Sequence, residues 1–141
     1  EISNFAKPGH RSKHNSSYWQ GEKYIGLGPS AHSYNGQNRM WNVANNIIYI
    51  KSIRQDEIPL EEEILSDTDR LNEYVMVSLR TMEGMDLQLI EDRFSTEERQ
   101  RIESILENQL KEGVLVRNNQ NVCLTPEGNL LADAISVKLF K

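Results

Sequence analysis

Three consecutive helix signals between residues 66 and 113 constrain the fold of this chain more than any other feature. Ser66, with Asp69 three residues later, is typical of a helix cap, and apolar side chains then recur at helical spacing. These apolar positions are Leu71, Tyr74, Val75, Leu79 and Met82. Gly84 supplies a left-handed stop, and Asp86 caps a second, shorter helix. Each helix therefore has one apolar face to bury.

The third helix has the clearest boundaries. Ser95 and Glu98 form a capping box, and Gly113 ends the helix. Its apolar stripe consists of Ile102, Ile105, Leu106 and Leu110. This helix completes a three-helix set that can enclose a core.

A β-hairpin is expected directly after the third helix. Residues 114–116 and 122–124 are β-prone, and the polar residues 117–121 between them favour a turn. Thr125 then caps and Pro126 opens a last helix. Three helices followed by a hairpin predict a mainly helical, winged-helix-like domain of the α+β class.

The charge of this predicted domain excludes nucleic acid as a partner. The third helix, residues 95–112, carries three basic against five acidic side chains, and the hairpin offers only Arg117. Residues 61–141 as a whole have a net charge of −8, whereas residues 1–60 have +3. Because phosphate neutralisation supplies most of the affinity for a duplex, we interpret the domain as a packing or docking unit.

The segment from His14 to Tyr34, HNSSYWQGEKYIGLGPSAHSY, is non-periodic and rich in histidine, aromatic residues and glycine. A loop of this composition usually presents a site. We expect short strands at residues 2–6 and 24–27, loop structure from His10 to Gln20, and irregular structure from Ser30 to Asn46.

Four side chains at the start of this segment are candidate ligands. His14 can ligate a metal or haem iron, Asn15 can orient it, and Tyr18 and Trp19 can lie against a flat macrocycle. Positive charge on the neighbouring Arg11 fits the propionates of a porphyrin. The alternative is a hydrogen-bonded packing histidine, which is the commoner role beside aromatic residues.

A second candidate site is the loop containing Gly26, Gly28 and Ser30. Its backbone amides can approach a phosphate or carboxylate, but no complete phosphate-loop motif follows. His32 is either a second polar ligand there or a structural residue.

Five segments of the chain occur in a familiar order. They are EISNFA at residues 1–6, HNSSYW at 14–19, YIGLGPSAHS at 24–33, RMWN at 39–42 and LTPEG at 124–128. Together they resemble the HemN/HemW family of radical S-adenosylmethionine proteins. The resemblance implies that residues 1–58 are the end of a radical-SAM (β/α) barrel and residues 59–141 the family's C-terminal domain.

The HNSSYW segment matches the pattern of the HemW branch, which is associated with haem binding. The resemblance therefore implies a haem chaperone that binds haem or porphyrin and hands it to haem-receiving proteins, with His14, Asn15, Tyr18 and Trp19 at the haem. One alternative is an oxygen-independent coproporphyrinogen III oxidase, in which Gly26, Gly28, Ser30 and His32 lie near the cofactor. Another is an interaction module without ligand.

The family's chemistry depends on a [4Fe–4S] cluster held by three cysteine thiolates, together with S-adenosylmethionine. The chain has one cysteine, Cys123. We therefore expect no catalytic residues in these 141 residues, no activity from them alone, and the cluster and cofactor only in a longer parent protein. Strands separated from a barrel expose edges, so we expect residues 1–55 either to be partly disordered or to pair with a second copy in a crystal.

A single thiol and the lack of a long apolar run predict a cytoplasmic protein without a transmembrane segment.

Overall fold

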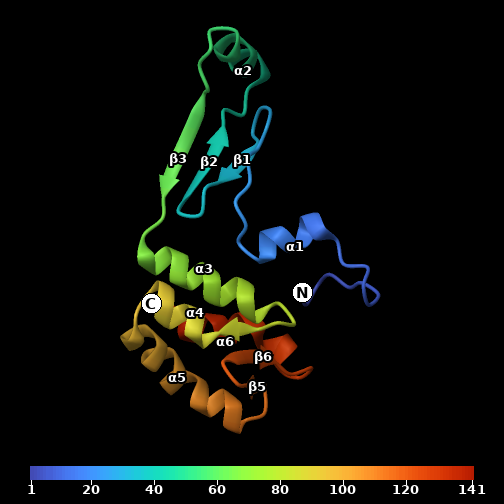
Figure 1. Ribbon diagram of the computed structural model, residues 1–141, viewed down its shortest axis with the longest axis vertical. Coiled ribbons are helices and arrows are strands. Elements are labelled where there is room, and N and C mark those ends of the chain that lie inside the picture. Colours follow the sequence, from blue (N-terminus) through green and yellow to red (C-terminus); the bar gives the residue numbers. More distant parts are fainter. The chain divides into compact units, whose positions relative to one another are not determined.

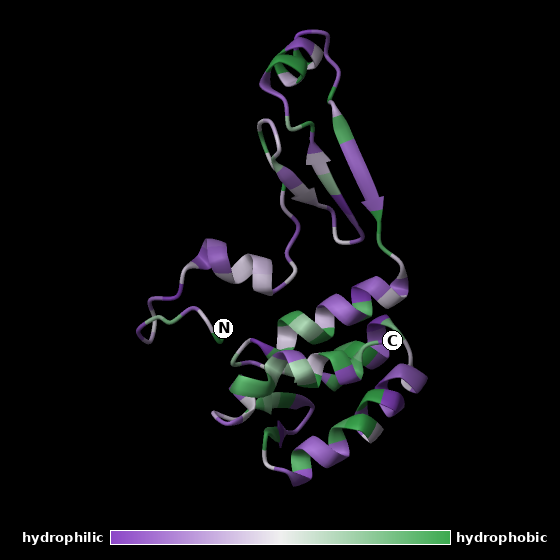
Figure 2. Cartoon of the chain, turned by 180° about the vertical axis from the view of Figure 1, so that it is seen from behind, coloured by the Kyte–Doolittle hydropathy of each residue, from purple (hydrophilic) through white to green (hydrophobic).

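The computed structural model describes all residues from 1 to 141 and contains six α-helices, six β-strands and one 3-10 turn (Figure 1). In chain order they are α1 (Lys13–Trp19), β1 (His32–Tyr34), β2 (Asn38–Asn42), α2 (Asn46–Ile53), β3 (Leu60–Ile64), α3 (Asp67–Leu79), β4 (Met85–Asp86), α4 (Leu87–Arg93), α5 (Thr96–Lys111), β5 (Leu115–Asn118), β6 (Asn121–Leu124), η1 (Gly128–Leu131) and α6 (Ala132–Leu139). The predicted α+β class is confirmed. Hydrophobic and hydrophilic residues alternate along α3 and α5, whereas α1 and most of β3 are hydrophilic (Figure 2).

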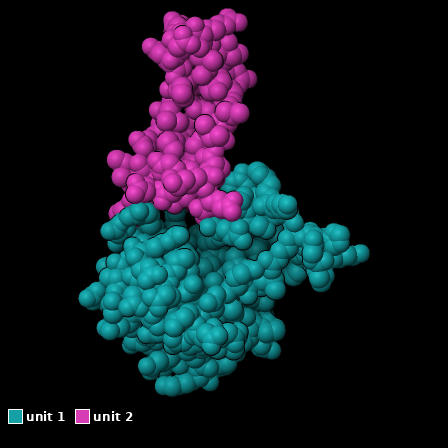
Figure 3. Space-filling view, viewed as in Figure 1, with its two compact units in different colours: residues 1–20, 67–141 teal, residues 21–66 magenta.

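The chain forms two compact units (Figure 3). The first consists of residues 1–20 and 67–141, and the second of residues 21–66. The first unit is therefore discontinuous in sequence. The acidic run at residues 61–63 forms most of β3 in the second unit.

The core of the first unit comes from its helices and its small sheet. The buried residues in contact are Leu71, Val75, Leu79, Met85, Leu87, Ile90, Ile102, Leu106, Leu115, Val122, Ile135 and Leu139. They include Leu71, Val75 and Leu79 of the first predicted helix, whereas Tyr74 is only partly buried. Met82 is 71% exposed, because α3 ends at Leu79 and not at Gly84 as predicted. Ile105 and Leu110 pack against this core from partly exposed positions.

The sheet of the first unit has the strand order β4-β6-β5, with both pairings antiparallel. The predicted hairpin is present, but its strands are longer than expected. Arg117 pairs with Val122 and Asn118 with Asn121, so the turn has two residues instead of five. Asn119 adopts a positive φ of 57°, a conformation that asparagine tolerates and that two-residue hairpin turns require.

Two of the predicted caps are confirmed. The Asp86 side chain accepts from the backbone N–H groups of Gln88 and Leu89, and the Ser95 hydroxyl accepts from that of Glu98. The Glu98 carboxylate, however, accepts from Arg101 and Lys141 instead of completing the capping box.

The last helix begins later than Pro126. The Thr125 hydroxyl accepts from Gly128 N–H at 3.1 Å, but η1 intervenes before α6 starts at Ala132. Gly128 is buried, and a Cβ there would lie 1.9 Å from the carbonyl oxygen of Val114. Residue 128 therefore has to be glycine, and the 3-10 turn η1 begins at this close approach to Val114.

The N-terminal twenty residues reverse two expectations. Residues 2–6 form no strand, and residues 13–19, expected as loop, form helix α1. The Ser12 hydroxyl accepts from Asn15 N–H at 3.2 Å and caps this helix. No apolar stripe follows Ser12 in the sequence, so a helix is not indicated there, and α1 buries no residue.

The second unit is an antiparallel sheet with the order β1-β2-β3, and α2 connects β2 to β3. Residues 30–46, expected to be irregular, therefore contain two strands. The expected strand at residues 24–27 is reduced to one bridge between Tyr24 and Tyr34. The N–H groups of Gly26 and Gly28 donate to the side-chain hydroxyls of Ser33 and Tyr49 and not to a neighbouring strand. Membership of residues 1–58 in a barrel stays a prediction.

Candidate functional site

Helix α1 presents two of the four predicted haem-site residues on an exposed row. His14 and Tyr18 are four residues apart, and their rings meet edge to face with centroids 5.0 Å apart. The Tyr18 hydroxyl lies 3.4 Å from Nε2 of His14, which is long for a hydrogen bond between these groups. Both side chains are exposed, so the imidazole is open to solvent.

Asn15 and Trp19 occupy the adjacent row of the same helix. Successive residues of an α-helix are rotated by about 100°, so this row faces a different direction from that of His14. Both residues line a cavity of about 580 Å³ within the first unit. The structure thus brings the four predicted residues together on two turns of helix, but divides them between an exposed row and a cavity.

The rest of the cavity lining comes from two distant parts of the sequence. The segment before α1 contributes Ile2, Phe5, His10 and Arg11, among others. The segment after α3 and the end of β6 contribute Arg80, Met82, Glu83, Cys123 and Leu124. His10, Arg80 and Met82 were missed in the sequence, because only the folded chain places them beside Trp19.

Two guanidinium groups of the lining are held by carboxylates. Arg11 Nη1 lies 2.6 Å from Oε1 of Glu83, and its Nη2 contacts the Met82 sulfur. The hydrogen bond from Arg11 is the main reason why the pKa of Glu83 lies below its usual value. Arg80 pairs with Asp133 and lies 4.0 Å from Glu1. The cavity therefore carries cations whose present partners are protein carboxylates.

The second predicted site lies in the second unit and is occupied by internal hydrogen bonds. Gly26 N–H donates to the Ser33 hydroxyl at 2.9 Å, and Gly28 N–H donates to that of Tyr49 at 3.2 Å. Ser30 N–H donates to Val43 O. These bonds shape the loop and engage the amides that an anion would need. His32 is exposed, with its ring centroid 6.0 Å from that of Trp41.

The residues of this chain do not fit an iron–sulfur cluster. Cys123 is the single cysteine, and the chain has no group of three His, Cys, Asp or Glu side chains arranged for a metal. Burial, followed by the negative charge of Glu83, raises the pKa of the Cys123 thiol. The thiol is therefore less ionised at neutral pH than an exposed cysteine. Separately, none of the helices has both the length and the apolar character needed to cross a membrane.

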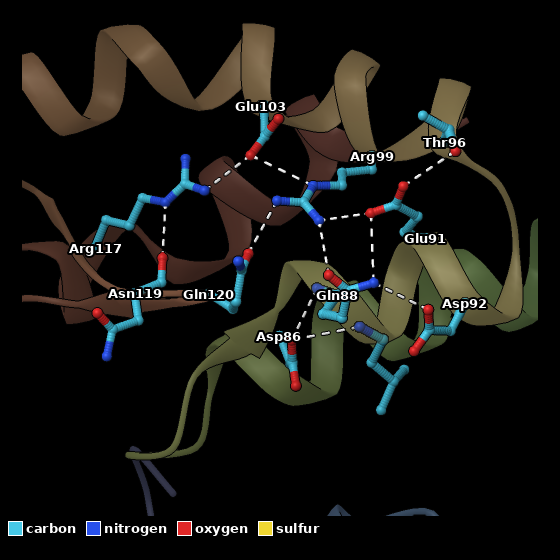
Figure 4. Close-up of polar contacts among 11 residues, drawn as sticks. Asp86, Gln88, Glu91, Asp92, Thr96, Arg99, Glu103, Arg117, Asn119 and Gln120 are labelled. Carbon is cyan, nitrogen blue, oxygen red and sulfur yellow. Dashed lines mark hydrogen bonds and ion pairs between the residues drawn. The ribbon is translucent and has the colours of Figure 1, made fainter.

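The basic residues of α5 and the hairpin are engaged within the first unit (Figure 4). Arg99 Nη1 lies 2.6 Å from Glu91 and donates to Gln88, and Nη2 donates to Gln120 at 2.9 Å. Arg117 donates to Glu103 at 2.9 Å and to the carbonyl oxygen of Asn119. These guanidinium groups connect α4, α5 and the hairpin, a structural role that accords with a docking or packing domain.

Comparisons with known proteins give consistent similarities. Residues 65–131 match the sequence family of the HemN C-terminal domain. The chain is 34% identical over 136 residues to the haem chaperone HemW of Mycobacterium tuberculosis, an alignment covering 96% of this chain and 33% of the relative. It is 31% identical over 137 residues to HemW of Bacillus subtilis, covering 96% and 36%.

One solved structure has a similar fold. Coproporphyrinogen III oxidase (HemN) from Escherichia coli, described as a radical SAM enzyme, matches with a TM-score of 0.60 and 21% identity. The match covers 83% of this chain and 28% of that protein. The chain thus spans about a third of the length of the curated relatives that it matches.

Proposed function

We propose that this chain is part of a haem chaperone of the HemN/HemW family, which binds haem and delivers it to other proteins. The match of residues 65–131 to the HemN C-terminal domain and the similarity to HemW proteins over 96% of the chain support this proposal. Haem is the cargo in this proposal. Helix α1 supplies the contact through His14, Tyr18 and their neighbours.

The observation that carries the proposal is the exposed imidazole of His14. Imidazole is a common axial ligand of haem iron. A ligand on an exposed helix lets haem approach from solvent and leave again, as delivery requires. The Tyr18 ring at 5.0 Å supplies an aromatic neighbour for the macrocycle, and its long contact with Nε2 is easily exchanged for iron.

The alternative function, an oxygen-independent coproporphyrinogen III oxidase, is supported by likeness of fold alone. The [4Fe–4S] cluster and S-adenosylmethionine of such an oxidase would have to be held by residues other than these 141. No observation on the loop of Gly26, Gly28 and Ser30 favours cofactor binding, because its amides are already engaged. We therefore retain the chaperone as the proposed function.

A titration of haem into the chain, followed in the Soret band, tests this function. We expect a saturable shift, and a loss of at least about tenfold in affinity for His14→Ala, equivalent to about 1.4 kcal/mol. His32→Ala is the matched control, since it removes an exposed imidazole from the second unit. Equal affinities for the two variants would exclude His14, and no saturable shift would overturn haem binding by this chain.

Delivery is tested separately from binding. The haem-loaded chain should pass its haem to apomyoglobin, seen as the appearance of the holo-myoglobin spectrum. Because His14 is exposed, transfer should be faster than from a protein that encloses its haem. Retention of haem by the chain under these conditions would contradict a delivery role.

A further inference from the structure

The cavity lined by Asn15 and Trp19 does not include His14 or Tyr18. We propose that this cavity is a second binding site, called the seat below, for a planar tetrapyrrole with carboxylate substituents. The choice of ligand class rests on the proposed function. The location rests on the size, lining and charges of the cavity.

The size and apolar lining of the cavity suit a flat organic ligand. Its volume of about 580 Å³ falls within the range of pockets that hold ligands of this class. Trp19 in the lining is half-buried, while Phe5 and Met82 are 91% and 71% exposed. Aromatic and thioether side chains of this kind gain by covering a macrocycle face, because it removes their apolar surface from water.

The cations of the lining suit carboxylate substituents. Arg11 and Glu83 form an ion pair in which both side chains are about half exposed, at 48% and 56%. An exposed pair of this kind contributes little to stability, so a ligand carboxylate can replace that of Glu83 at small cost. Arg80 is less exposed, at 26%, and its carboxylate neighbours are Asp133, at 81%, and Glu1, at 4%. Arg11 is therefore the exchangeable anchor, and Arg80 is a second cation of the lining.

The seat is distinct from the His14 contact because of helix geometry. His14 and Tyr18 do not line the cavity, whereas Asn15 and Trp19 do. A macrocycle ligated by His14 would lie on the exposed row, about 100° around the helix from Trp19. Within the cavity, His10 offers a different imidazole for iron.

Alkylation of Cys123 reports on this seat directly. Cys123 lines the cavity and is the one thiol of the chain, so a thiol reagent such as iodoacetamide measures its accessibility alone. The probe is metal-free protoporphyrin IX, added in the dark, because it needs no axial ligand. At ten times its Kd it should slow alkylation by about tenfold, since only the unoccupied fraction reacts.

Matched variants separate the cavity from other sites. His14→Ala should keep the full protection, while Arg11→Gln and Arg80→Gln should weaken it. Arg117→Gln should not, because Arg117 lies in the hairpin network outside the cavity. In a Cys123→Ser background, Glu112→Cys places a thiol at an exposed position outside the cavity, and its alkylation should be unaffected.

The outcomes distinguish this seat from the proposed function. Haem binding that depends on His14, without protection of Cys123 by protoporphyrin, overturns the second seat and leaves the chaperone proposal standing. Protection that is lost in His14→Ala also overturns it, because there is then a single site. Protection that persists in His14→Ala, with a residual Soret shift removed by adding His10→Ala, supports the seat and its imidazole.

Discussion

Gly84 is a residue whose backbone conformation and surroundings both require glycine. Its φ is +75°, and a Cβ there would lie 2.4 Å from the carbonyl oxygen of Val122 and 2.5 Å from Cys123 Sγ. We expect Gly84→Ala to lower the free energy of unfolding by at least about 2 kcal/mol, since backbone strain and a clash with main chain add together. Urea denaturation measures the loss.

Gly113 is the control for this substitution. Its φ is +74°, but nothing lies within 4 Å of the position of a Cβ. Gly113→Ala should therefore cost only the left-handed conformation, about 1 kcal/mol. Similar losses for the two variants would show that the contact with Val122 is relieved by a small movement.

Glu98 should make stability depend on pH. Hydrogen bonds from Lys141 and then Arg101 hold its pKa below the ordinary value of 4.5, and its side chain is only 13% exposed. Because the folded-state pKa is lowered, the stabilisation is complete above the unfolded value and is lost as pH falls through the folded value. The excess stability of the wild type over Glu98→Gln should therefore be constant near neutral pH and shrink below pH 4.5.

Urea midpoints of the two proteins across this range provide the measurement. Glu107→Gln is the comparison on the same helix, because its ion pair with Lys111 is 3.9 Å long and exposed. That variant should differ little from the wild type throughout. An excess stability for Glu98 that grows on acidification would contradict the assignment.

Among the elements, α1 should be the one most dependent on its cap. It has seven residues, buries none of them, and is too short to be stable by helix propensity alone. Ser12→Ala removes the bond to Asn15 N–H and should cost about 1 kcal/mol of helix stability. If α1 carries the haem contact, haem affinity should fall by up to about fivefold.

Ser12→Asp keeps a capping oxygen and should retain the affinity for haem. Circular dichroism of the two variants separates a loss of helix from a loss of contact. A Ser12→Ala protein with unchanged haem affinity would mean that α1 keeps its shape without the cap.

The elements that could be predicted from the sequence are those with local signals at both ends. Helices α4 and α5 follow Asp86 and Ser95, which cap them, and Gly113 ends α5 with a positive φ. The strands β1 and β2 lack a regular alternation of exposed and buried positions, and the second partner of β2, β3, lies beyond α2 in the chain.

The candidate site was predictable as a segment but not as a geometry. The residues HNSSYW indicate a ligand-binding stretch, yet the loop interpretation places all four candidates on one edge. The helix instead separates His14 from Trp19, and it makes the cavity with Arg80 and Met82, which lie more than sixty residues further along the chain. Contacts over that sequence distance carry no local signal.

For the whole molecule, the position of the core predicts which part folds alone. Every residue of the connected core of the first unit lies between Leu71 and Leu139. A shortened chain of residues 65–141 should therefore unfold in one cooperative transition, seen by circular dichroism on heating. A broad transition, or binding of a dye for exposed apolar surface, would show that residues 1–20 are required.

The division into two units has an optical consequence. The chain contains two tryptophans, with Trp19 in the first unit and Trp41 in the second. The indole of Trp41 donates to Glu61 at 2.9 Å, whereas that of Trp19 borders the cavity. Intrinsic fluorescence is thus already a separate label for each unit: Trp41→Phe leaves emission from the first alone, and Trp19→Phe leaves it from the second. The order in which the two units lose their structure can be followed without an attached dye.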